Sequence, residues 1–122
     1  MELVFAHVAI AVTDLCRSTD FYCHVLGAKV IGIFESPLRR VMLNVGGQSV
    51  ELLQYMDADN SPDRLTGVIN HIAFKVVNLD QIITTLLQQG VCCEASQPKQ
   101  AGSKRIFFFY GPDGERIEFI EE

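Results

Sequence analysis

The feature that most constrains the fold of this chain is a repeated segment that begins with histidine. "HVAIAVTD" spans residues 7–14, and "HIAFKVVN" spans residues 71–78. In both segments the histidine opens an apolar run with strand-like alternation, and alanine follows it two residues later. Two such segments, 64 residues apart, indicate that the chain contains a duplicated structural unit.

The order of elements after each histidine is also repeated. In the first half a strand at 3–12 precedes a helical stripe, which is capped by Thr13 or Asp14 and ends at Gly27. In the second half a strand at 68–77 precedes a helix that is capped by Asn78 and ends at Gly90. Three further strands are expected in each half, at residues 28–35, 39–45 and 49–55 and at residues 91–95, 105–110 and 115–121. The sequence therefore predicts that each half forms a β-α-β-β-β unit and that the whole chain has an α+β fold.

The two halves are expected to form one domain, residues 1–122, because half of this chain is too short to bury a sheet by itself. We expect a first module at about 1–56 and a second at about 68–122. The segment between them, at about 56–67, is polar and rich in turn-forming residues, so it is interpreted as a linker.

The composition narrows the class of protein. Apolar residues make up 48% of the chain and charged residues 20%, as is typical of a soluble globular domain. A net charge of −5 argues against nucleic acid or an anionic membrane as a partner. The chain has no signal-peptide pattern and no apolar run near the roughly 20 residues that span a bilayer, so we expect a cytoplasmic protein. Its four cysteines show no CxxC spacing and are interpreted as free thiols.

Strand alternation places one imidazole and one carboxylate on the same side of each half. His7 and His71 share a face with the alanines that follow them, while Glu51 and Glu118 lie opposite apolar neighbours that would pack under a helix. Two nitrogens and two oxygens suit zinc, nickel, cobalt, manganese or ferrous iron. A single His/Glu pair would more often be an ordinary surface pair, but the repetition favours a metal site.

These segments resemble the vicinal oxygen chelate superfamily, which includes glyoxalase I, methylmalonyl-CoA epimerase, extradiol dioxygenases and fosfomycin resistance proteins. The resemblance covers essentially the whole chain. It is carried by "HVAIAVTDLCRSTDFYCHVLGAKV", "HIAFKV" and "GPDGERIEFIE". It implies two tandem βαβββ modules whose mixed sheet curls around a metal-binding cleft, with the helices on the outer face.

The glyoxalase I pattern implies a function and a set of site residues. Its metal ligands fall on four positions that carry the expected residue types: His7, Glu51, His71 and Glu118. The implied activity is that of a lyase or isomerase acting on a small 2-oxo or thiohemiacetal substrate, as lactoylglutathione lyase does. Neighbouring substrate oxygens would chelate the metal and stabilise an enediolate. The resemblance makes Glu118 the expected base and Glu51 a possible second base.

The sequence indicates the metal ligands more strongly than the identity of the substrate. Ala11 and Tyr55 replace an arginine and an asparagine of bacterial glyoxalase I, which argues against glutathione recognition. Basic residues could still contact an anionic substrate, and two tyrosines are expected at the pocket. The candidate substrate contacts are Arg39, Arg40, Tyr55, Lys104, Arg105 and Tyr110.

Two alternatives to the glyoxalase interpretation stay open at this point. One is proton transfer of the methylmalonyl-CoA epimerase type, which uses the same metal-assisted chemistry. The other is a non-catalytic small-molecule binding or drug-resistance module. In either case we expect a homodimer, because two small modules leave apolar sheet surface that needs cover.

Overall fold

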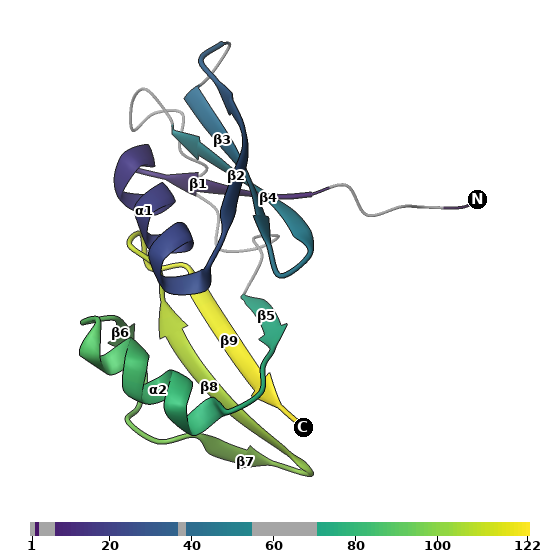
Figure 1. Ribbon diagram of the computed structural model, residues 1–122, viewed down its shortest axis with the longest axis vertical. Helices are drawn as coiled ribbons and strands as arrows, with labels where there is room; N and C mark the ends of the chain where they lie inside the picture. The colour runs from purple at the N-terminus through teal and green to yellow at the C-terminus, as the bar shows by residue number, and fades with distance from the viewer. Residues whose placement is uncertain (1, 3–6, 37–38, 55–70) are drawn as a thin grey trace. The chain divides into compact units, whose positions relative to one another are not determined.

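The strand and helix order of the two halves follows the duplicated pattern (Figure 1). The computed structural model describes residues 2, 7–36, 39–54 and 71–122. The chain divides into unit 1, residues 1–63, and unit 2, residues 64–122. Tyr55, the expected linker at 56–67 and the beginnings of the strands expected at 3–12 and 68–77 lie outside the described residues.

Unit 1 has one helix on a four-stranded sheet, in the order β1-β4-β3-β2. Strand β1 runs parallel to β4, and the other neighbouring strands are antiparallel. Helix α1 contacts β3 and β4. The elements are β1 (Val8–Val12), α1 (Leu15–Leu26), β2 (Lys29–Phe34), β3 (Arg39–Val45) and β4 (Gln48–Gln54).

Unit 2 repeats this arrangement with one additional strand. Its sheet has the order β5-β9-β8-β6, with β7 paired to β8, and β5 again runs parallel to the last strand. Helix α2 contacts that strand, β9. The elements are β5 (Ile72–Lys75), α2 (Leu79–Gln88), β6 (Cys92–Cys93), β7 (Lys99–Ala101), β8 (Lys104–Tyr110) and β9 (Arg116–Glu121). The expected α+β class is confirmed.

Both helices begin and end close to the residues that the sequence indicated. Asp14 caps α1, where its side chain accepts a hydrogen bond of 3.0 Å from the backbone N–H of Arg17. Gly27 ends this helix with a left-handed φ of 68°, which glycine adopts without steric cost. Asn78 precedes α2, also with a left-handed φ of 62°, but its side chain makes no capping hydrogen bond.

The first N–H of each helix is bound instead by the last strand of the same unit. Leu15 donates to Oε1 of Gln54 at 2.8 Å, and Leu79 donates to Oε2 of Glu121 at 2.8 Å. These contacts satisfy a backbone donor that has no partner within the helix. Gln54 and Glu121 both lie three residues after the glutamates singled out above, so the duplication extends to this contact.

The core of each unit lies between its helix and the facing side of its sheet. Alternate residues of β3, β4, β8 and β9 are buried there, as the strand pattern predicted. Among the least exposed strand residues are Leu43, Val50 and Leu52 in unit 1 and Phe107, Phe109 and Ile117 in unit 2. The expected helical stripe is confirmed in part, because Leu87 of α2 is 45% exposed.

The structure differs from the predicted elements mainly in the second half. Strand β6 covers only two of the five residues expected at 91–95. Strand β7 lies between the strands expected at 91–95 and 105–110, where no strand was predicted, and a turn with Gly102 at φ 62° folds it back onto β8. Among the described residues no helix is long and apolar enough to cross a bilayer.

Candidate functional site

The two His/Glu pairs occupy equivalent places in the two units. In unit 1, Ala9 of β1 lies opposite Glu51 of β4, and His7 is two residues before that alanine. In unit 2, Ala73 of β5 lies opposite Glu118 of β9, and His71 is two residues before that alanine. Each histidine therefore enters a strand that runs parallel to the strand carrying the glutamate.

Both glutamates point away from the helix that covers their sheet. Glu51 lies between Val50 and Leu52, which are 2% and 0% exposed, so its side chain emerges on the opposite face. Glu118 is flanked in the same way by buried apolar residues of β9. The two carboxylate side chains are only 15% and 12% exposed. We call this side of each sheet the open face, because helix α1 or α2 covers the other side.

In unit 2 the imidazole and the carboxylate are neighbours. Nε2 of His71 lies 3.4 Å from Oε1 of Glu118. Two donors bound to one zinc-sized ion at about 2.1 Å and a tetrahedral angle would be roughly 3.4 Å apart. The nitrogen and oxygen of this pair therefore fit a divalent transition metal in chemistry and in spacing. Among the described residues, no group of three or more His, Cys, Asp or Glu side chains lies close enough to hold an ion.

An aromatic ring supports His71. Phe108 of β8 lies opposite Glu118 in the antiparallel register of β8 and β9. Its ring meets the imidazole of His71 edge-on, at 5.7 Å between centroids and an interplanar angle of 90°. The guanidinium of Arg116 covers the ring of Phe108 at 3.7 Å. Phe108 is thus held between a cation and the histidine.

Arg116 is itself fixed by a carboxylate from the end of β6. Nε and Nη2 of Arg116 donate to Glu94 at 2.8 and 3.2 Å, and the hydroxyl of Tyr110 donates to the same carboxylate at 2.5 Å. These donors lower the pKa of Glu94, the hydrogen bond from Arg116 contributing most. The same contact to Glu94 raises the pKa of Tyr110. The charges of Arg116 and Glu94 balance, and the network holds the Arg116 guanidinium that covers Phe108.

In unit 1 an arginine lies beside the glutamate. Nε of Arg40 is 3.6 Å from Oε2 of Glu51. The guanidinium also lies 4.5 Å from the centroid of the Phe34 ring and donates to the backbone oxygen of Ser36 at 3.1 Å. Arg40 is therefore a cation held close to one of the proposed ligands.

The structure separates the expected substrate contacts by the face of the sheet on which they lie. Lys104 and Tyr110 follow the alternation of Phe108, and Arg40 follows that of Met42, which lies opposite Glu51. These three residues share the open face of their unit with its glutamate. Tyr55 lies outside the described residues.

Arg39 and Arg105 follow the alternation of the buried residues instead. Arg39 pairs with Glu35 at 3.4 Å. Arg105 binds Glu121 at 2.6 Å and Asp80 of α2 at 3.1 Å. It therefore links β8, β9 and the beginning of α2. Both arginines thus have ion-pair partners within their own unit, and their predicted contact with substrate stays a prediction.

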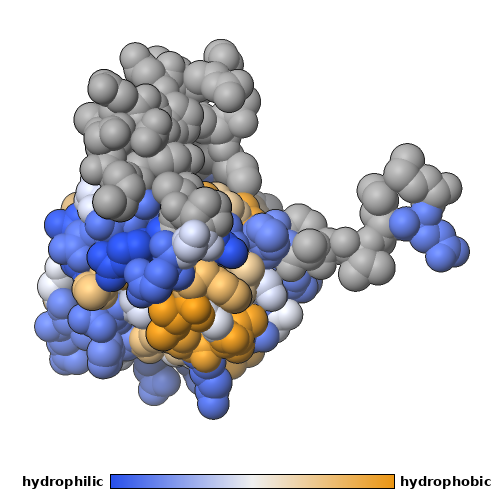
Figure 2. Space-filling model, turned by 90° about the horizontal axis from the view of Figure 1, so that it is seen from above, coloured by the Kyte–Doolittle hydropathy of each residue, from blue (hydrophilic) through white to orange (hydrophobic). Residues whose placement is uncertain are grey.

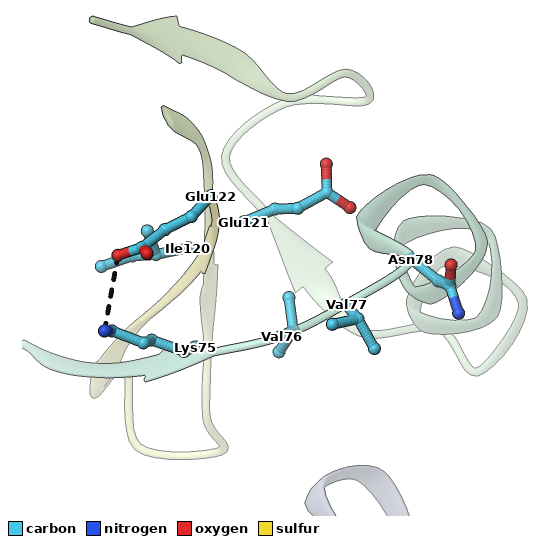
Figure 3. A pocket seen from close by; sticks show the side chains of 7 residues that line it. All are labelled: Lys75, Val76, Val77, Asn78, Ile120, Glu121 and Glu122. Carbon is cyan, nitrogen blue, oxygen red and sulfur yellow. Dashed lines mark ion pairs between the residues drawn. The ribbon is translucent and has the colours of Figure 1, made fainter. Parts of the chain in front are cut away.

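A pocket of about 420 Å³ opens at the other end of β5 from His71 (Figure 3). Lys75 and Glu122 form an ion pair of 3.4 Å at its edge. Its lining residues are Lys75, Val76, Val77, Asn78, Ile120, Glu121 and Glu122. Neither His71 nor Glu118 lines this pocket, so the metal-type donors and this pocket are separate features of unit 2.

The sequence predicted that each histidine and glutamate share a face of their unit, but it did not predict the residues around His71. Phe108, Arg116 and Glu94 come from three different strands or strand ends, so no local spacing relates them. A partial signal was present, because strand alternation already places Phe108 on the face opposite Phe107 and Phe109. Nothing in the sequence pattern paired Phe108 with His71.

Comparison with known proteins supports the architecture. The chain is 34% identical over 123 residues to lactoylglutathione lyase from Escherichia coli O157:H7, covering 95% of this chain and 90% of that protein. It is 28% identical over 116 residues to mitochondrial methylmalonyl-CoA epimerase from Mus musculus, covering 88% and 65% of the two chains. The crystal structure of the glyoxalase family protein from Enterococcus faecalis matches with a TM-score of 0.77 and 28% identity, over 97% of each chain.

A family profile matches almost the whole chain. It is described as the Glyoxalase/Bleomycin resistance protein/Dioxygenase superfamily, and it spans residues 4–119. The match includes both His/Glu pairs. The chain belongs to the Glyoxalase/Bleomycin resistance protein/Dioxygenase superfamily, with the two-unit architecture expected from its vicinal oxygen chelate resemblance.

Proposed function

We propose that this protein is a metal-dependent lyase or isomerase of the glyoxalase I type, acting on a small 2-oxo or thiohemiacetal substrate. One divalent ion (zinc, nickel, cobalt, manganese or iron) would be held by His7, Glu51, His71 and Glu118. The observation that carries the proposal is the strand register, which is the same in both units. In each unit an alanine lies opposite the glutamate, and the histidine is two residues before that alanine. The proposal holds whether the two pairs come from one chain or from two copies.

The proposed reaction moves a proton between neighbouring carbons of the substrate. The metal, when bound, supplies positive charge that stabilises negative charge on the substrate oxygens and acidifies the adjacent C–H. Glu118 accepts the proton from one carbon and returns it to the next, so no external acid or oxidant is consumed. Its side chain is 12% exposed, which limits exchange of that proton with water. Glu51 is the second candidate for this role.

The substrate would be oriented by polar residues on the open faces. Arg40 lies beside Glu51 and would attract an anionic group of the substrate. Lys104 and Tyr110 share the open face of unit 2 with Glu118, and Tyr55 remains part of the proposal from its place in the sequence. The proposed thiol part of the substrate is left unspecified, because Ala11 and Tyr55 differ from the glutathione-binding pattern.

The proposal predicts a large loss of activity in Glu118→Gln. This change keeps the size and an oxygen donor of the side chain but removes the base, so we expect kcat to fall by roughly 10²–10⁴. The measurement is isomerisation of methylglyoxal–thiol adducts by metal-loaded protein. Asp20→Asn, which changes an exposed carboxylate on α1, should retain activity. Equal activity of Glu118→Gln and the unaltered protein would contradict the assigned base.

The second candidate is proton transfer on an acyl-CoA thioester. The 28% identity to methylmalonyl-CoA epimerase favours it over other reactions of the superfamily. Deuterium wash-in on methylmalonyl-CoA, measured beside the methylglyoxal adducts, separates the two. Activity on the thioester alone would replace the glyoxalase assignment. A protein that binds no divalent ion and is inactive in both assays would instead be a binding module.

The proposal also includes the assembly and location of the protein. We propose a homodimer in the cytoplasm, with a small molecule as the only other partner. The acidic composition, with a net charge of −5, supports a cellular role away from nucleic acids and anionic membranes.

A further inference from the structure

Two lysines of unit 2 converge on one carboxylate, at the end of the open face away from His71. Nζ of Lys75 on β5 and Nζ of Lys104 on β8 lie 3.4 and 3.5 Å from the same atom, Oε1 of Glu122. Figure 3 shows Lys75 and Glu122 paired at the edge of the pocket. The two ammonium groups lower the pKa of Glu122, and Lys75 contributes most. We call these three residues the lysine cluster; its two positive charges exceed its single negative charge.

Positive charge is concentrated at this end of unit 2, although the chain as a whole has a net charge of −5. Three of the four lysines of the sequence are Lys75, Lys99 and Lys104. Lys99 of β7 lies opposite Ile106, in the part of β8 that leads from Lys104. The side chains of Lys75 and Lys104 are 77% and 50% exposed, so a ligand can reach both. This end of the sheet therefore attracts anions.

Apolar residues separate the lysine cluster from the His71/Glu118 pair. Each of the three central strands has one apolar residue on the open face between the two places. These residues are Ala73 on β5, Ile120 on β9 and Ile106 on β8. Ile120 lies opposite Lys75 on one side and opposite Ile106 on the other. Four residues of strand span about 13 Å, so the cluster and the metal-type donors lie roughly that far apart along β9.

The exposed apolar side chains of the two units have different charged neighbours. In unit 2, Val77 is 77% exposed and lines the pocket together with Lys75. In unit 1, exposed apolar side chains such as Ile33 lie on β2, whose only charged residue is Lys29. Figure 2 shows apolar surface gathered in one patch in the view from above. Within the described residues, only the surface in unit 2 combines apolar side chains with two lysines that share a partner.

We propose that the lysine cluster binds a carboxylate at the far end of the substrate, whose reacting oxygens lie at the His71/Glu118 pair. The substrate is then a 2-oxo compound or thiohemiacetal with an apolar arm of roughly 10 Å that ends in a carboxylate. The carboxylate of Glu122 already occupies the place between the two ammonium groups, and that of the substrate would displace it. This inference rests on the proposed function and names the part of the substrate that was left unspecified.

Thiols with the same arm and different ends test this binding. The methylglyoxal adducts of mercaptohexanoate and mercaptohexanol are compared as substrates of the metal-loaded protein. We expect KM to be about fivefold lower for the carboxylate adduct and kcat to be similar, because the contact is made far from the reacting atoms. The adducts of mercaptoacetate and mercaptoethanol should not differ in this way, since so short an arm cannot reach the cluster.

Variants of the cluster should change this KM in opposite directions. Lys75→Gln and Lys104→Gln should each raise KM for the long carboxylate adduct alone, whereas Glu122→Gln should lower it because the competing carboxylate is gone. Arg17→Gln removes a positive charge from α1, on the covered side of the sheet of unit 1, and is the control that should change neither adduct. A general loss of stability would affect both adducts alike. A Glu122→Gln variant that raises KM, as the lysine variants do, would contradict the proposal.

Binding to metal-free protein separates this inference from the proposed function. Hexanoate is added in the presence of a chelator, and the ε-methylene NMR signals of the lysines are followed. Saturable shifts at Lys75 and Lys104, with none at Lys29 and none on addition of hexanol, are expected. Such shifts in a protein that is inactive on every adduct would support the cluster and refute the proposed function. Turnover of the adducts without any preference for the carboxylate, or equal shifts at all lysines, would refute the cluster alone.

Discussion

His71 has the most elaborate set of neighbours among the proposed metal ligands. One side of its imidazole faces the Glu118 carboxylate, and the edge of Phe108 meets its ring. Groups that orient a metal-binding histidine influence the affinity of the site for its metal, although they do not touch the ion. If His71 binds the metal as proposed, we expect Phe108 to be a positioning residue, which is itself held by Arg116 and Glu94.

This role predicts different effects for two adjacent phenylalanines. Phe108→Leu should weaken metal affinity by roughly 10-fold with little loss of stability, because it loosens the His71 ring without opening the core. Phe107→Leu changes a side chain that is 2% exposed under α2, so it should lower the free energy of unfolding by about 1 kcal/mol and leave metal affinity unchanged. Competition with a chromophoric chelator and denaturant unfolding give the two quantities. Equal metal affinity of both variants would remove the positioning role of Phe108.

At the scale of elements, each helix is attached to the last strand of its own unit. The side chain of Gln54 in unit 1 and that of Glu121 in unit 2 accept a hydrogen bond from the first N–H of the helix. Glu121 also binds Arg105, which in turn binds Asp80 in the first turn of α2. The N–H of Leu79, followed by Arg105, lowers the pKa of Glu121 below its ordinary value of 4.5.

The lowered pKa gives a direction for the pH dependence of stability. The ionised form of Glu121 is favoured in the folded protein, so its contribution is complete above about pH 4.5 and is lost as the pH falls through the folded pKa. Glu121→Gln keeps an acceptor for Leu79 but loses the charge. We expect it to lower Tm at pH 7, with a difference from the unaltered protein that shrinks below pH 4.5. Scanning calorimetry at several pH values measures this, with Glu2→Gln as the exposed control. A pH-independent difference would contradict the ionic contribution.

Much of the element order could be predicted from the sequence because it depends on local patterns. The stripe of apolar residues and Gly27 set the bounds of α1, and alternation set the faces of Glu51 and Glu118. Strand β7 was missed because it is short and is defined by pairing with β8 and not by its own pattern. The hydrogen bond from the Leu79 N–H at the beginning of α2 to Glu121 was not predicted, because the two residues are 42 positions apart along the chain.

At the scale of the whole molecule, duplication explains why both units carry the same donors. The register of β1 with β4 and of β5 with β9 is equivalent, and the superfamily profile spans both units. The histidine and glutamate positions could be predicted because they recur within the chain. The ion pairs of Arg39 and Arg105 could not be predicted, since the partner of a basic residue near a strand end is not set by local sequence.

The central claim is that the two His/Glu pairs bind one ion together. Metal analysis of protein purified without chelator, combined with affinity measurement on His7→Ala and His71→Ala, tests it most directly. The account predicts one divalent ion per chain, and a loss of at least about 100-fold in affinity in either variant, because each removes one of four ligands. Two ions per chain, no ion, or full metal retention in either variant would contradict it.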